Sequence, residues 1–150
     1  MPNLHPLLVH FPIALLMIYG LMELIRVRKI LNWQPWFYLK AVFVILGALA
    51  AVPAAISGLL VIQEFAVTPQ ATAILTKHTL SAYASILSFL PLAIVYAIAW
   101  RKGTKPGRWT IILALIGLFF LTVTGALGGG FVHGSGVDPM VQFVFKMLGL

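Results

Sequence analysis

The chain has no cysteine among its 150 residues. Without a thiol it can supply no disulfide, no thiolate metal site, no covalent haem attachment and no cysteine-ligated cluster. Charged residues are scarce as well, at 9% of the chain, whereas a soluble domain carries about a quarter. Water could not solvate a surface of this composition, so the sequence excludes an ordinary soluble domain.

Acidic residues are rarer still, with 3 Asp and Glu against 10 Lys and Arg and a formal net charge of +7. A basic balance can indicate nucleic acid binding, but here the cations gather beside apolar segments, where they act as topology signals. Eight of them fall in two connections: Arg26, Arg28, Lys29 and Lys40, then Arg101, Lys102, Lys105 and Arg108. We therefore predict a lipid bilayer, and no nucleic acid, as the partner.

Apolar residues make up 61% of the chain, and the mean hydropathy is +1.05. A spanning helix needs about 20 apolar residues, so four spans occupy nearly the whole length. The short connections favour an all-α, antiparallel four-helix transmembrane bundle in a single domain. The predicted spans cover about 4–25, 36–62, 78–100 and 109–130, and the first is too long and lacks the basic flank of a cleaved signal.

The C-terminal segment is too short to span. Asp138 followed by Pro139 predicts a helix N-terminus, and apolar residues then recur at helical spacing to about residue 149. We expect a short amphipathic helix over about 138–149, lying in the interface or packing against a partner subunit.

The positive-inside rule places both basic connections in the cytoplasm and both chain ends outside. Lys40 is expected to reach the interface from the start of the second span. Glu23 is expected to pair with Arg26, its neighbour on the same helix. Glu64 falls in the outer connection, where it could support a histidine or remain solvated.

Small residues fall on single faces of the spans, among them Gly47, Ala51, Ala54 and Gly58 in the second and Gly117, Thr124, Gly125, Gly128 and Gly129 in the fourth. Such faces allow close helix packing in membranes. They could also leave room for a flat cofactor between helices, and the two interpretations are compatible.

All four histidines, His5, His10, His78 and His133, fall at the outer end of the predicted bundle. Histidine at the edge of a bilayer is costly and is commonly functional, although interfacial hydrogen bonding alone could also explain it. Several imidazoles at one depth suit two kinds of site. One is a haem b, which needs only axial imidazoles. The other is a zinc or copper site, for which His5, His10 and His133 are the best-placed ligands.

The haem interpretation assigns His10 and His78 as axial ligands because they open two co-oriented spans. Gly58 and Gly125 lie at comparable depth on the other two spans, where a porphyrin edge needs clearance. Lys77 could meet the propionates.

The opening LHPLLVHFPIAL resembles that of a bacterial membrane-protein family known as the family of unknown function 2231. The shared features are His5-Pro6, Val9-His10-Phe11-Pro12, Lys77-His78 and the glycine-rich stretch from Gly128 to Asp138. The chain departs from the family pattern at His133 and Ser135, where the family has tyrosine and then histidine. The resemblance implies an inner-membrane protein in a redox neighbourhood, next to cytochrome c-like or Rieske-type modules.

Four functions follow as hypotheses. The first is a small haem-b electron carrier, rather than a stand-alone enzyme, that exchanges electrons with quinol, a periplasmic cytochrome or another redox subunit. The second is a non-catalytic accessory subunit that docks onto a larger complex, with no cofactor. The third is the zinc or copper site, and the fourth is a transporter that forms a homo- or hetero-oligomer.

Overall fold

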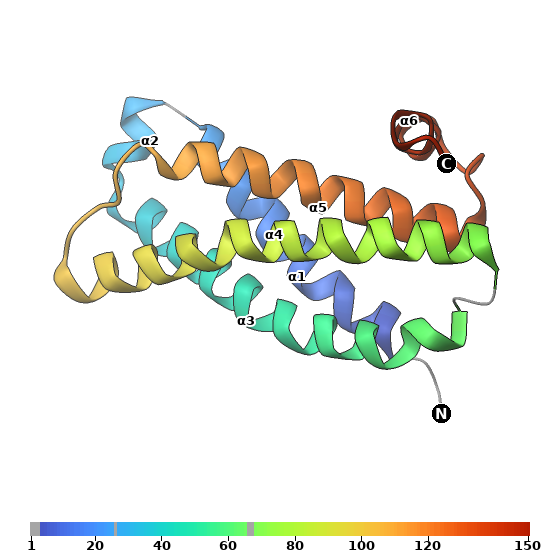
Figure 1. The fold of residues 1–150 in the computed structure, drawn as a ribbon. Coiled ribbons are helices and arrows are strands. Elements are labelled where there is room, and N and C mark those ends of the chain that lie inside the picture. Colours follow the sequence, from blue (N-terminus) through green and yellow to red (C-terminus); the bar gives the residue numbers. More distant parts are fainter. Residues whose placement is uncertain (1–3, 26, 66–67) are drawn as a thin grey trace.

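The computed structural model describes residues 4–25, 27–65 and 68–150, and these residues form six α-helices and no strand. The four long helices run antiparallel, and the two chain ends lie at the same end of the bundle (Figure 1). The helices are α1 (His5–Leu24), α2 (Arg28–Asn32), α3 (Gln34–Phe65), α4 (Pro69–Lys102), α5 (Thr110–His133) and α6 (Pro139–Leu148).

Four of these helices are long and apolar enough to cross a membrane: α1, α3 from Gln34 to Ile62, α4 and α5. The predicted fold class, a four-helix transmembrane bundle with a short C-terminal helix, is confirmed. The interior prolines Pro12, Pro53 and Pro91 fall within α1, α3 and α4, and each helix continues through its proline.

Helix α4 begins at Pro69, well before the predicted span start near His78. The Thr68 side chain accepts a hydrogen bond from the Ala71 amide at 3.1 Å, and proline follows at the first helical position. Both are helix-start signals. Because 34 residues at 1.5 Å each extend roughly 50 Å, α4 is longer than the hydrocarbon core.

One half of the bundle, which we call the basic half, contains the ends joined by α2 and by the 103–109 connection. Its core holds Leu16, Tyr19, Phe89 and Tyr96, each at most 2% exposed. The spans approach closely at glycines, since a Cβ atom at Gly117 would lie 2.7 Å from the Phe89 ring. The predicted packing role of the small residues therefore holds in this half.

The basic half also contains a buried ionic network. The Glu23 carboxylate is 2% exposed and accepts hydrogen bonds from Tyr19 at 3.0 Å and from Tyr96. Lys40 forms an ion pair with Glu23 at 3.2 Å and lies 5.3 Å from the centre of the Tyr96 ring.

This network corrects one expectation, the placement of Lys40 at the interface. Glu23 pairs with Lys40 of the next long helix, and the predicted partner Arg26 lies outside the described residues. Lys40 is only 11% exposed, so its ammonium is directed to the carboxylate instead of to the interface. The physical reason is that a carboxylate inside an apolar bundle needs a cation within reach, and α3 supplies one.

The other half, which we call the histidine half, carries α6 across its end. Asp138 caps α6 by accepting hydrogen bonds from the amides of Met140 at 2.8 Å and Val141 at 2.9 Å, as predicted. The buried face of α6 packs on α5 and on Ile74 near the start of α4. Its opposite face exposes Met140, Phe143 and Met147. The predicted amphipathic helix is thus present, and its place in the bilayer interface stays a prediction.

Candidate functional site

The histidine half contains a partly open cavity of about 500 Å³, within the size range of ligand pockets. Helices α1, α3, α4 and α5 all contribute to its wall, which is mostly aliphatic. Four imidazoles lie on this wall, those of His5, His10, His78 and His133. The histidines that the sequence placed at one end of the bundle therefore surround one space.

His78 projects from α4 toward α5 and is held there by the backbone. Its Nδ1 lies 3.0 Å from the Thr124 carbonyl oxygen. A carbonyl can only accept, so Nδ1 carries the proton and Nε2 carries the lone pair. A Cβ atom at Gly128 would lie 3.2 Å from the His78 ring, so glycine makes room for this imidazole.

His10 adopts the same tautomer for the same reason. Its Nδ1 donates to the carbonyl oxygen of Pro6, one turn earlier in α1. Metal-ligating histidines commonly show this arrangement, in which one nitrogen is fixed by a carbonyl and the other faces the metal. His10 is solvent- or lipid-exposed, whereas His78 is partly buried.

His5 is anchored to α3. Its Nδ1 lies 2.9 Å from the Ser57 hydroxyl, which donates its own proton to the Ala54 carbonyl at 2.8 Å. The hydroxyl therefore accepts from His5. His5 and His78 line the same cavity.

The two predicted clearance glycines both line the cavity but differ in what they face. A Cβ atom at Gly58 would lie 2.9 Å from the His5 ring, so His5 already uses that space. At Gly125, and at Gly129 one turn further along α5, nothing lies within 4 Å of the position a Cβ would take. The open part of the wall is therefore on α5.

Two residues with predicted supporting roles do not line the cavity in the described part of the chain. The Lys77 ammonium donates to the Leu148 carbonyl oxygen and so ties α4 to the C-terminal end of α6. Glu64 is exposed near the end of α3. Contact of Lys77 with propionates stays a prediction.

Among the described residues, no three His, Asp or Glu side chains come together closely enough to hold a metal ion. The zinc or copper set of His5, His10 and His133 is therefore not assembled. The positions of the residues explain this. His5 is held against α3, whereas His133 is the last residue of α5, on another wall of the cavity. A haem makes a smaller demand, since its iron needs only axial ligands.

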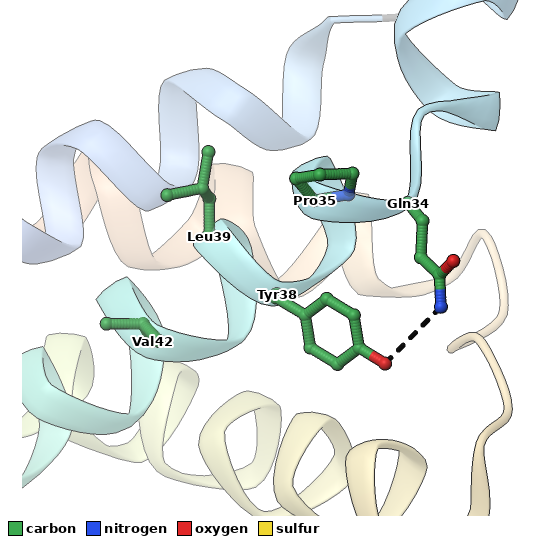
Figure 2. Close-up of a pocket in the computed structure, with 5 residues that line it drawn as sticks. All are labelled: Gln34, Pro35, Tyr38, Leu39 and Val42. Carbon is green, nitrogen blue, oxygen red and sulfur yellow. Dashed lines mark hydrogen bonds between the residues drawn. The ribbon is translucent and has the colours of Figure 1, made fainter.

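A second hollow, of about 310 Å³, lies on the outer surface of α3 (Figure 2). All five lining residues belong to one helix and are exposed: Gln34, Pro35, Tyr38, Leu39 and Val42. It contains no histidine or carboxylate, and its polar contact is a hydrogen bond of 3.5 Å from the Gln34 amide to the Tyr38 hydroxyl. We assign no chemistry to it.

Sequence reasoning missed the groups that orient the histidines, namely the Ser57 hydroxyl and the Thr124 carbonyl. A serine one residue before Gly58 on the small-residue face of α3 was an available signal for the first. No sequence signal identifies a backbone carbonyl as a partner.

Comparison with protein families gives one match, in which the model of a family described as a predicted membrane protein covers residues 1–139. The match includes all four spanning helices and ends where α6 begins. No curated protein and no solved structure matches the chain.

Proposed function

The chain belongs to the family of predicted membrane proteins of unknown function 2231, and on that premise we propose that it is a small haem-b-binding electron carrier. The cofactor is placed in the cavity of the histidine half, with His10 and His78 as axial ligands. The haem would supply an iron that takes up and releases one electron.

One observation carries this proposal. His10 and His78 lie on the wall of the same cavity, and each has its Nδ1 bonded to a backbone carbonyl. Both therefore present an Nε2 lone pair, the form of imidazole that binds iron. The aliphatic wall and the open surface over Gly125 suit a flat apolar macrocycle.

The distribution of charge supports the orientation and the partners. Arg28, Lys29, Lys102, Lys105 and Arg108 are exposed at the basic half, which the positive-inside rule puts in the cytoplasm. The histidine cavity then faces the periplasmic side of an inner membrane. Electron exchange with membrane quinol, a periplasmic cytochrome or another redox subunit follows from that placement.

The test is an absorption spectrum of the detergent-purified protein expressed with a haem supply, before and after dithionite. We expect a sharp Soret band and resolved α and β bands on reduction, lost in His10→Ala and in His78→Ala. His133→Ala is the matched control and should retain the spectrum. A protein that is folded by circular dichroism yet colourless would rule out the haem site.

A non-catalytic accessory subunit is the second candidate, favoured by the apolar face that α6 exposes through Met140, Phe143 and Met147. Such a face could dock onto a larger complex. Copurification of a stable assembly with a colourless chain, disrupted by Phe143→Asp, would support this function over the first.

A further inference from the structure

Helix α1 packs on α3 in both halves of the bundle, through Glu23 and Lys40 in the basic half and through His5 and Ser57 in the histidine half. In the basic half it also packs on α5, where a Cβ atom at Gly20 would lie 2.5 Å from the Leu118 side chain. In the histidine half the His5 ring lies over Gly58 of α3. Figure 1 shows α1 moving away from α5 as it approaches the N-terminus. We call the boundary between α1 and α5 the seam. It is closed by side-chain contacts in the basic half, and it is bordered by cavity-lining residues in the histidine half.

The α5 side of this seam carries two glycines and therefore presents backbone where other residues would present side chains. Gly125, Gly129 and His133 follow one another at intervals of four residues and so lie on one face of the helix. All three line the cavity, and the two glycines leave open space where a side chain would be. We call this face of α5 the trough: it presents the backbone of Gly125 and Gly129 and ends at the exposed imidazole of His133.

The surface around the seam is apolar. Val132 on α5 lines the cavity, is 69% exposed and belongs to a helix that can cross the membrane. Side chains of this kind face lipid in a spanning bundle. A reactant that reaches the trough from this side therefore comes from the bilayer.

We propose that the cavity opens to the bilayer between α1 and α5, and that a long-chain hydroquinone binds in this opening. Its ring lies on the backbone of Gly129, one hydroxyl donates to the His133 imidazole, and the apolar tail remains in the lipid. His10 and His78 stay available to the haem. The inference rests on the proposed function only for the role of the hydroquinone as electron donor, because its binding needs no haem.

The first experiment is photolabelling of the full chain in lipid nanodiscs with an azido-substituted long-chain quinone. We expect the label in peptides covering residues 125–133, displaced by excess unlabelled quinol. Gly129→Leu places a side chain where the ring would lie and should lower labelling at least about tenfold. His133→Ala removes one hydrogen bond and should weaken quinol competition about threefold to tenfold.

Ala14→Leu is the matched control, because Ala14 is exposed on α1 but does not line the cavity. It should label like the unaltered protein. Equal labelling of Gly129→Leu and the unaltered protein, or label spread evenly over the spans, would overturn the site.

The second experiment tests the direction of access. Since the chain has no cysteine, Gly129→Cys offers a single position for a nitroxide spin label. We expect this label to collide more often with oxygen, which partitions into lipid, than with a water-soluble nickel chelate. The opposite ranking would show an opening to water and contradict the lateral route.

Repeating the labelling with and without haem distinguishes failure of the haem site from failure of the hydroquinone site. A haem-loaded protein without specific label would overturn this inference and leave the haem site intact. A colourless protein labelled at residues 125–133 would support this inference and exclude the haem.

Discussion

The two halves of the bundle use glycines and ionisable residues in different ways. In the basic half, Gly20 and Gly117 are covered by Leu118 and Phe89, and the buried Glu23 and Lys40 form an ion pair. In the histidine half, Gly125 and Gly129 face open space and the four histidines line a cavity. A membrane protein cannot gain much from burying apolar surface, so close contacts must hold its helices together. Close contacts at Gly20 and Gly117 hold the helices of one half together, while the bare backbone at Gly125 and Gly129 leaves space beside α5 in the other.

The largest expected effect in this comparison comes from removing the buried carboxylate. Glu23→Ala leaves the Lys40 ammonium and two phenols without their shared acceptor, and the free energy of unfolding should fall by about 3–5 kcal/mol. Thermal or denaturant unfolding in detergent, followed by circular dichroism, measures the change.

Glu64→Ala is the matched control in the histidine half, because Glu64 is exposed, and it should change the free energy of unfolding by less than about 0.5 kcal/mol. Replacing both Glu23 and Lys40 by Leu should restore much of the loss, since neither charge is then stranded. If Glu23→Ala and Glu64→Ala lowered the free energy of unfolding equally, the buried network would not be a main source of the bundle's stability.

The next effect comes from adding the same side chain to the two halves. Gly117→Leu forces atoms into the Phe89 ring and should cost about 1–3 kcal/mol of unfolding free energy. Gly125→Leu enters open space and should cost less than about 0.5 kcal/mol. Melting curves of the two variants give the comparison directly. If Gly125→Leu is the more damaging, the histidine half is not hollow.

The smallest effect concerns α6 alone. Asp138→Ala removes two amide hydrogen bonds from the helix start and should lower the stability of α6 by about 1 kcal/mol. Amide hydrogen exchange should quicken in residues 139–148 while the core of the spans is unchanged. Asp138→Asn keeps the capping oxygen and should exchange like the unaltered protein. Faster exchange throughout α5 would show that α6 also holds the bundle together.

The architecture was predictable because its cause is local. Four long apolar runs in a sparsely charged chain leave few folds besides a spanning bundle, and the Asp138-Pro139 pair marks the start of α6 by itself. The clustering of histidines at one end followed from the same topology, and the cavity brings all four together.

The contacts between helices were not predictable, because each depends on which helix the fold places beside the residue. Gly128 and Gly129 are adjacent and identical in sequence, yet one receives the His78 ring and the other faces open space. Glu23 had a cation three residues away as the obvious partner, but the fold brings Lys40 from the next long helix.

The hollow half has a mechanical consequence. The helices around a cavity of about 500 Å³ have fewer packed neighbours on that side, whereas packed interiors yield little to pressure. Lateral pressure from the surrounding lipid should therefore displace mainly the helices that border the cavity, while the tightly packed basic half stays rigid. We expect lipids that pack tightly to narrow the space between the histidines.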